Sequence, residues 1–171
     1  MSDTTSAPHS WQTIYLGLGG NISNELGDPV SHVLSVADSL GRHADFADVR
    51  LSSLYRSKPF GVLDQPDFVN AVLSARTRLS PIALLDFCQN LEQAAGRVRL
   101  RHWGERSLDV DILLYGDTMM DSERLSIPHK GLFERSFVII PLLELQPDMT
   151  VNGVPLSSLS LAKDETLLKL N

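Results

Sequence analysis

The segment from Gly96 to Gly116 constrains the fold of this 171-residue chain most, because it joins a basic stretch directly to a strand-like one. Its second half, residues 107–115, is rich in aliphatic residues interrupted by two aspartates. Successive side chains of a strand point to opposite faces of a sheet, so Asp109 and Asp111 share one face and Val110 lies on the other. We therefore expect a strand that is buried on one side and carries two carboxylates on the other.

The two carboxylates predict a magnesium site. Mg²⁺ binds one or two carboxylates, keeps several waters and takes substrate phosphates as further ligands. The alternative is a solvated strand edge. Ile112, Leu113 and Leu114 argue against it, because they indicate a buried strand, on which unpaired carboxylates would be costly.

The basic half of the segment predicts contacts with phosphate. Guanidinium groups bind phosphate oxygens bidentately and stay charged at any working pH. The arginines are Arg97, Arg99, Arg101 and Arg106, around His102, Trp103 and Gly104. Such a cluster is often only a solvated loop, and it becomes informative through its position beside the acidic strand. Together the two halves predict a polyphosphate site.

Composition indicates one globular domain. The chain is 43% hydrophobic and 21% charged, with a net charge of −6. We expect a polar, disordered tail over residues 1–11 and a single domain over 12–171. The negative charge and the lack of a long apolar run argue against nucleic-acid and membrane partners. A single cysteine, Cys88, favours a reduced, cytoplasmic protein, and we expect a monomer with small-molecule substrates.

The predicted elements alternate as strand, helix, strand, strand, helix, strand. The strands are Thr13–Leu18, Phe46–Tyr55, Asp67–Leu79 and 107–115, with helices after the Asp28–Pro29 and Ser80–Pro81 caps. Gly19, Gly20 and Asn21 predict a tight turn after the first strand; no Gly-Lys-Ser/Thr follows, so it is not a Walker A loop. This order predicts an α+β fold with a ferredoxin-like βαββαβ core, helices on one face and C-terminal additions.

The C-terminal third is expected to be irregular. A brief strand is predicted over Arg124–Ile127 and short helical turns around Pro141 over Leu132–Leu145. Asn152 and Gly153 predict a hairpin turn, and the remainder a terminal helix.

The acidic strand and the segment before it resemble the signature of the 6-hydroxymethyl-7,8-dihydropterin pyrophosphokinases of folate biosynthesis. The matching residues are Trp103, Gly104, Arg106, Leu108, Asp109, Asp111, Ile112 and Leu113. The similarity extends from about Tyr15 to about Met149. It implies an enzyme that transfers pyrophosphate from ATP to the hydroxymethyl group of the dihydropterin and releases AMP, with two Mg²⁺ ions.

The resemblance also implies a role for each matching site residue. The catalytic set is Arg97, Arg106, Asp109 and Asp111, of which the two aspartates hold the metal ions. The nucleotide set is Glu92, Arg99, Trp103, Ile112, Arg124, Ser126, His129 and Arg135. The pterin set is Ser57, Lys58, Phe60, Phe68, Asn70 and Phe137, with the last aromatic and Phe68 stacking on the pterin ring.

Other interpretations stay open at this point. Phe68 is also a plausible core residue, and Glu92 a surface one. His102 and Lys130 stand where the family commonly has arginine and tyrosine. A non-catalytic paralogue that kept the pterin and nucleotide pocket is one rival. An RNA-binding module is another, but it would need exposed aromatics on central strands and a basic surface.

Overall fold

The computed structural model describes residues 10–59, 64–96 and 105–170. Most of the predicted tail, residues 1–9, lies outside this part of the chain, as do Phe60, Arg97, Arg99 and Trp103. The predicted roles of these four side chains therefore fall outside the described residues.

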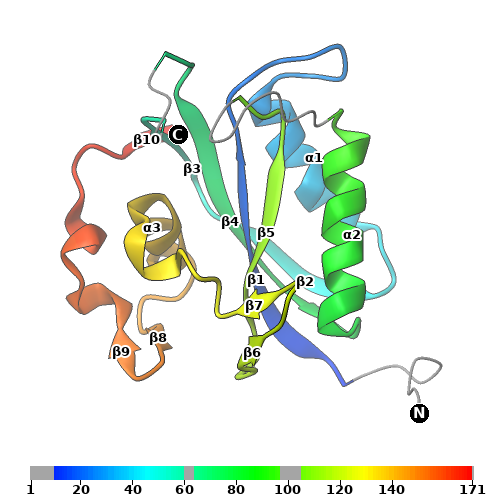
Figure 1. Ribbon diagram of the computed structural model, residues 1–171, viewed down its shortest axis with the longest axis vertical. Coiled ribbons are helices and arrows are strands. Elements are labelled where there is room, and N and C mark those ends of the chain that lie inside the picture. Colours follow the sequence, from blue (N-terminus) through cyan, green and yellow to red (C-terminus); the bar gives the residue numbers. More distant parts are fainter. Residues whose placement is uncertain (1–9, 60–63, 97–104, 171) are drawn as a thin grey trace.

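An antiparallel sheet forms the centre of the molecule (Figure 1). Its strands follow the order β10–β3–β4–β1–β5, and β2 pairs with β4 beside β3. Their bounds are Gln12–Gly20 (β1), Phe46–Leu51 (β2), Leu54–Ser57 (β3), Phe68–Thr77 (β4), Asp109–Tyr115 (β5) and Leu168–Leu170 (β10). The longest strands, β1 and β4, pair along their whole length from Gln12–Thr77 to Gly20–Val69.

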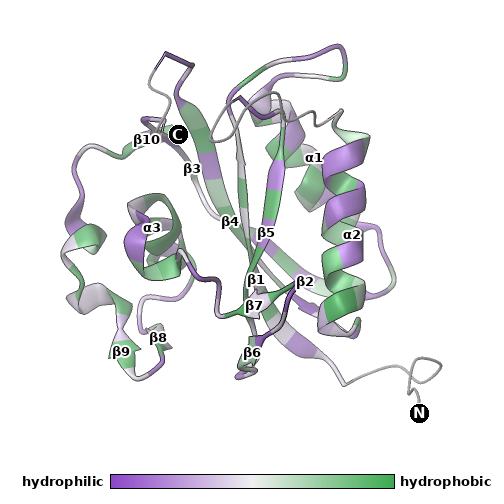
Figure 2. Ribbon diagram, viewed as in Figure 1, coloured by the Kyte–Doolittle hydropathy of each residue, from purple (hydrophilic) through white to green (hydrophobic). Residues whose placement is uncertain are grey.

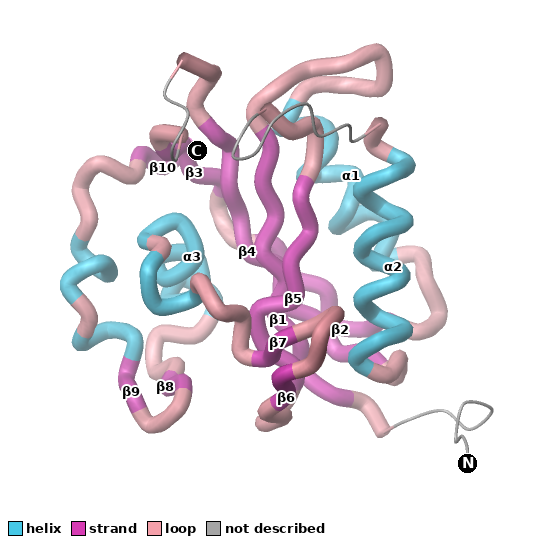
Figure 3. The backbone as a smooth tube through the Cα atoms, in the orientation of Figure 1, coloured by secondary structure: helices cyan, strands magenta, loops and turns pink. Residues whose placement is uncertain are grey.

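Two helices cover one face of this sheet and a third covers the other, as the tube in Figure 3 also shows. Helices α1 (Pro29–Gly41) and α2 (Pro81–Ala94) begin at capped prolines. Asp28 Oδ1 accepts from the Ser31 N–H at 2.7 Å, and Ser80 Oγ from the Ala83 N–H at 3.2 Å. Helix α3 (Ser136–Leu145) lies on the opposite face. Within the described residues, no helix has the length and apolar character to cross a bilayer.

Side-chain alternation in the strands gives each face its own core. Ile14, Leu16 and Leu18 of β1 are buried beneath α1 and α2. Val72 of β4 and Leu113 of β5 point to the other face and pack with α3. Figure 2 shows this alternation as bands of apolar and polar residues. The carboxylate-bearing side of β5 therefore faces the layer of α3.

The predicted α+β class and core order are confirmed. The core runs β1, α1, β2 with β3, β4, α2 and β5, and β1 and β4 are the central strands. This order is consistent with a ferredoxin-like core, and the two core helices lie on one face as expected.

The predicted strand Phe46–Tyr55 is two strands, because regular strand pairing is interrupted at Ser52. The Ser52 N–H donates to the Val72 carbonyl at 2.8 Å, and Ser52 Oγ accepts from the Val72 N–H at 2.9 Å. A side-chain oxygen thus replaces a backbone acceptor at one position of the ladder, and the strand ends there.

The predicted terminal helix is wrong. Residues after the hairpin form 3-10 turns at Leu156–Ser158 and Ser160–Lys163, and the chain then ends in β10, which pairs with β3. The spacing of apolar residues in this segment is compatible with a helix. The edge of β3, however, offers backbone hydrogen-bond partners, and the local sequence does not indicate them.

The rest of the C-terminal third follows the predictions more closely. The Asn152–Gly153 turn is confirmed between β8 (Thr150–Val151) and β9 (Val154–Pro155). The brief strand before Pro128 is β7 (Ser126–Ile127), paired with β6 (Met120–Asp121). After a 3-10 turn at Leu132–Glu134, α3 runs as a single helix through Pro141 rather than as separate turns.

Candidate active site

Two glycines of the central strand β1 form the floor of a cavity on the α3 side of the sheet. Gly19 lies opposite Asn70 of β4 on one side and Asp109 of β5 on the other, and Gly17 lies opposite Asp111. Directly opposed residues point to the same face of a sheet. The side chains of Asn70 on β4 and of Asp109 and Asp111 on β5 therefore border Gly17 and Gly19, which carry no side chains. A Cβ at Gly19 would lie 3.0 Å from Asn70 Oδ1.

This arrangement corrects the predicted turn at Gly19 and Gly20. The strand continues through both residues. Glycine is needed here for close approach, not for a turn. Neither Gly17 nor Gly19 was predicted as a site residue, although glycines at alternate positions of a strand are a detectable signal of close approach.

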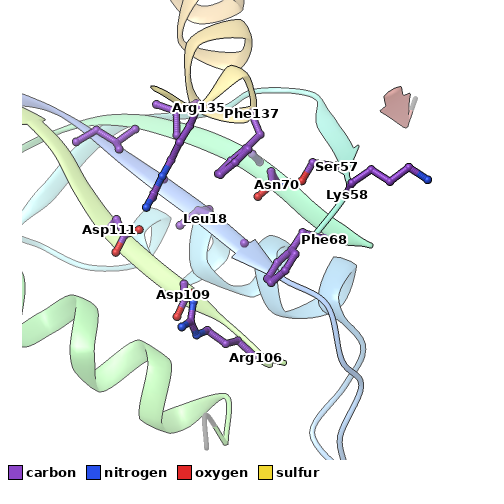
Figure 4. A pocket seen from close by; sticks show the side chains of 15 residues that line it. Leu18, Ser57, Lys58, Phe68, Asn70, Arg106, Asp109, Asp111, Arg135 and Phe137 are labelled. Carbon is purple, nitrogen blue, oxygen red and sulfur yellow. Dashed lines mark hydrogen bonds and ion pairs between the residues drawn. The ribbon is translucent and has the colours of Figure 1, made fainter. Parts of the chain in front are cut away.

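The cavity gathers residues from five parts of the chain (Figure 4). All the described residues of the catalytic and pterin sets line it, together with Arg135. They are Ser57, Lys58, Phe68, Asn70, Arg106, Asp109, Asp111, Arg135 and Phe137. Lys58 extends away from the others in Figure 4, whereas Arg135 points toward Asp111.

On one side of the cavity, Arg106 and Asp109 form an ion pair. Arg106 Nη1 lies 3.0 Å from Asp109 Oδ2, and the side chains are only 15% and 20% exposed. Among the described residues, the buried Nε of Arg106 has no hydrogen-bond partner. A buried guanidinium nitrogen without a partner is costly, so the site is not fully satisfied in the ligand-free protein.

Asp111 lies two residues further along the same strand, near His129, and its side chain is 43% exposed. His129 Nε2 is 3.9 Å from Asp111 Oδ2, and His129 Nδ1 accepts from the Gly131 N–H at 2.9 Å. Burial raises the pKa of Asp111; His129 opposes this rise and Asp109 adds to it. Burial also lowers the pKa of His129, and Arg135 lowers it further against the pull of Asp111. The imidazole therefore favours its neutral form, with the proton on Nε2.

The pterin set lies on the opposite side of the glycine floor. Asn70 Nδ2 donates to Ser57 Oγ at 2.6 Å, which orients the Asn70 amide oxygen toward Gly19. Phe68 at the start of β4 and Phe137 at the start of α3 project into the same cavity. The guanidinium carbon of Arg135 lies 5.8 Å from the centre of the Phe137 ring, so the ring contacts a cation as well.

The donor set fits magnesium. No group of three or more His, Cys, Asp or Glu side chains suited to a metal lies within the described ranges. Two carboxylates alone suit a hard cation that completes its shell with water and phosphate oxygens. Arg106 lines the same cavity, so a guanidinium lies next to the two carboxylates.

Several residues of the predicted nucleotide set lie outside this cavity. Arg124 pairs with Asp86 of α2 at 2.7 Å, and Ser126 Oγ donates to Asp121 Oδ1 at 2.9 Å. Glu92 accepts from the Val110 N–H at 2.8 Å, on the side of β5 away from β1. The Glu92 carboxylate thus accepts a backbone hydrogen bond at the outer edge of β5.

Ile112 points its side chain into the core beneath the helices. Its backbone groups are two residues from Val110 and so point to the same outer edge of β5 as the Val110 N–H. Any contact of Ile112 with a nucleotide would therefore be made by its backbone.

A sequence model of a protein family matches residues 15–147, and its description is 7,8-dihydro-6-hydroxymethylpterin-pyrophosphokinase (HPPK). This chain belongs to the HPPK family. A protein of Haemophilus influenzae named 2-amino-4-hydroxy-6-hydroxymethyldihydropteridine pyrophosphokinase is 43% identical over 162 residues, which are 93% of this chain and 98% of that protein. A protein of the same name from Pseudomonas aeruginosa is 42% identical over 138 residues, covering 81% and 83% of the two chains.

Solved structures show the same HPPK fold at lower identity. A Plasmodium falciparum HPPK-DHPS crystal structure with pteroate has a TM-score of 0.69 and 12% sequence identity. The similarity covers 95% of this chain but 42% of that longer one. At this identity the likeness establishes the fold alone.

Proposed function

We propose that this protein transfers a pyrophosphoryl group from ATP to the hydroxymethyl group of 6-hydroxymethyl-7,8-dihydropterin and releases AMP. The observation that carries the proposal is one cavity with two chemically distinct sides. Arg106, Asp109 and Asp111 make one side suited to phosphate, and Asn70 and Phe137 make the other suited to a flat heterocycle. The non-catalytic alternative loses support, because Arg106, Asp109 and Asp111 line one cavity and the relatives at 40–43% identity carry the enzyme name.

The charged side would position the triphosphate and neutralise its charge. Arg106 presents a buried guanidinium to the transferred group, and Asp109 keeps it oriented through the 3.0 Å ion pair. Arg135 and His129 approach Asp111 from α3 and the segment before it. Phosphoryl transfer depends mainly on positioning and charge stabilisation, which agrees with a cavity whose side chains are mostly charged on this side.

Asp109 and Asp111 would hold two Mg²⁺ ions, which when bound neutralise phosphate charge and polarise the attacking oxygen. An ionised carboxylate at Asp111 needs a cation nearby, because burial disfavours its charge. Dependence on ATP and Mg²⁺ is therefore part of the proposal.

The pterin side would hold the ring between Phe68 and Phe137. Such stacking contributes roughly 0.5–1.5 kcal/mol per aromatic pair beyond burial. Asn70, held by Ser57, would present its amide oxygen to donors on the ring edge. Lys58 would contact the outer rim, since its side chain extends away from the centre of the cavity.

The remaining members of the nucleotide set would act along the outer edge of β5. Glu92 and the backbone of Ile112 lie there, and Arg124 and Ser126 belong to the neighbouring segment around β7. We propose that ATP spans from this edge into the cavity. The proposal also includes the catalytic, nucleotide and pterin roles that the family resemblance implies for residues outside the described ranges, namely Phe60, Arg97, Arg99 and Trp103. A monomeric, single-domain enzyme over residues 12–171 is proposed as well.

The deciding experiment measures AMP and the pyrophosphorylated pterin when purified protein is mixed with ATP, Mg²⁺ and the dihydropterin alcohol. Arg106→Ala should lower kcat on the order of 10²-fold or more, by analogy with other charge-stabilising arginines. Arg42→Ala is the matched control, because Arg42 forms an exposed 2.9 Å ion pair with Asp38 on α1. No AMP from the wild-type protein, or wild-type turnover in Arg106→Ala, would overturn the proposal.

A further inference from the structure

Asn21 connects the two sides of the cavity through a single side chain. Its Nδ2 donates to Gln65 Oε1 at 2.8 Å and to the Pro66 carbonyl at 2.9 Å. Its Oδ1 accepts from the Arg106 N–H at 2.9 Å. Its own backbone N–H donates to the Arg106 carbonyl at 2.8 Å. The segments around Pro66 and Arg106, about forty residues apart, are thus both hydrogen-bonded to the Asn21 side chain.

The partners determine which way the Asn21 amide points. Gln65 Oε1 and the Pro66 carbonyl on one side are acceptors, and the Arg106 N–H on the other is a donor. A flipped amide would therefore oppose like groups at the two backbone contacts, the Pro66 carbonyl and the Arg106 N–H. Asn21 is only 4% exposed, so water does not replace these bonds readily and losing them leaves buried polar groups unpaired.

Each partner segment leads directly into one side of the cavity. Pro66 lies two residues before Phe68, the first residue of β4. Arg106 carries the guanidinium that pairs with Asp109. The neighbouring backbone is also tightly packed, since a Cβ at Gly20 would lie 2.4 Å from the Ser107 carbonyl oxygen. Asn21 therefore sits at a rigid junction rather than in an adaptable loop.

We infer that Asn21 is a positioning residue that sets the distance between the pterin and phosphate sides of the site. This inference rests on the roles proposed above for Phe68 and Arg106. Direct transfer between two bound substrates requires the attacking oxygen to lie close to and in line with the phosphorus, and a misplacement of about 1 Å can cost on the order of 10²-fold in rate. Asn21 touches neither substrate in this account and acts only through its two partner segments.

The expected signature is a loss of turnover without a matching loss of binding. Asn21→Ala should lower kcat roughly 10- to 100-fold. The dissociation constants of ATP–Mg²⁺ and of the dihydropterin, each measured alone by calorimetry, should change less than about 3-fold, because each side keeps its own contacting residues. A merely structural residue would lower stability and both affinities together.

Two partial variants separate the halves of the connection. Gln65→Ala removes one acceptor of the Asn21 amide and leaves the Pro66 carbonyl, so it should lower kcat less than Asn21→Ala does. It should have little further effect in the Asn21→Ala background, because coupled contacts are not additive. Asn21→Asp keeps an oxygen for the Arg106 N–H, but its other oxygen meets the Gln65 and Pro66 acceptors, so it should lower kcat at least as much as Asn21→Ala does.

Thr77→Val is the matched control. Thr77 is fully buried in the same sheet, and its Oγ1 donates to the Asp45 carbonyl at 2.9 Å at the opposite end of β4 from the cavity. It should lower Tm but leave kcat unchanged. With an active wild-type enzyme, wild-type kcat in Asn21→Ala, or an equal kcat loss in Thr77→Val, would overturn the inference. If Asn21→Ala does not fold, wild-type kcat in both partial variants would do the same.

Discussion

Asp109 and Asp111 lie on the same face of β5 but have different partners. Asp109 forms a 3.0 Å ion pair with Arg106, whereas Asp111 lies 3.9 Å from His129, an imidazole that favours its neutral form. In the ligand-free protein, Asp109 thus has a direct guanidinium partner, whereas the guanidinium of Arg135 only points toward Asp111 (Figure 4). The two aspartates should therefore behave differently when they are replaced.

Asp111→Asn should stabilise the ligand-free protein while removing its activity. Burial raises the folded-state pKa of Asp111, so ionising it costs folding free energy once the pH exceeds that pKa. Asparagine keeps the shape without the charge. Because the Asp111 side chain is 43% exposed and solvent screens its charge, we expect only a small rise in Tm by calorimetry at neutral pH with a chelator present. The kcat should be at least about 10²-fold lower. A lower Tm would contradict this prediction.

Asp109→Asn is the informative comparison for that experiment. It should also lower kcat, but it leaves the largely buried guanidinium of Arg106 without its 3.0 Å partner. Its Tm should therefore fall rather than rise. Equal Tm changes in the two variants would show that Arg106 beside Asp109 and His129 beside Asp111 affect stability to the same degree.

The activity should decline on the acid side at a higher pH than an ordinary aspartate would cause. Metal binding needs ionised Asp111, and its raised pKa means that protons compete more strongly as the pH falls. Additional Mg²⁺ should shift the acid limb of kcat/KM for ATP to lower pH, because metal and proton compete for the same carboxylate. An acid limb that does not move with Mg²⁺ concentration would argue against metal binding at Asp111.

Phe137→Ala and Phe68→Ala should weaken pterin binding selectively. Loss of one stacking partner should raise KM for the dihydropterin about 10-fold and leave KM for ATP almost unchanged. Steady-state kinetics with each substrate varied in turn measures both values. The control is Phe87→Leu, in an aromatic cluster with His43 and Phe46 on the other face of the sheet. A comparable KM change in Phe87→Leu would remove the assignment.

Glu144→Gln should destabilise the attachment of α3 to the sheet in a pH-dependent way. Glu144 Oε1 accepts from the Tyr55 hydroxyl at 2.6 Å, and Oε2 from the Ser53 N–H at 2.8 Å. Burial opposes its charge, but these hydrogen bonds outweigh burial and lower its pKa. The stabilisation is therefore present above the unfolded-state pKa and lost as the pH falls through the folded one.

We expect Glu144→Gln to cost about 1 kcal/mol at neutral pH, since the side chain is largely exposed, and to match the wild type in acid. Denaturant unfolding at several pH values measures the difference. Glu123→Gln, at an exposed position, should have no effect at any pH. A cost that persists unchanged in acid would mean that the charge of Glu144 does not contribute.

Local patterns in the sequence were sufficient to predict the helices and strands of the core and the pairing of Asp109 with Asp111 on one strand face. Alternation put Asp109 and Asp111 on one face of β5, and the Asp28 and Ser80 caps marked the starts of α1 and α2. These features depend on residues a few positions apart, which is the range over which strand alternation and helix capping act.

Tertiary structure alone decided which distant residues share the cavity and how the ends of the chain are used. The terminal segment became β10 because the edge of β3 was available to it, and no local spacing reports a free edge. Likewise, Gly19 is a strand residue rather than part of a turn because Asn70 and Asp109 flank it on neighbouring strands. The link from Asn21 to Gln65 and Arg106 also required the folded chain. Hydrogen bonds of this kind depend on the register of whole elements, which the packing of the sheet and helices sets.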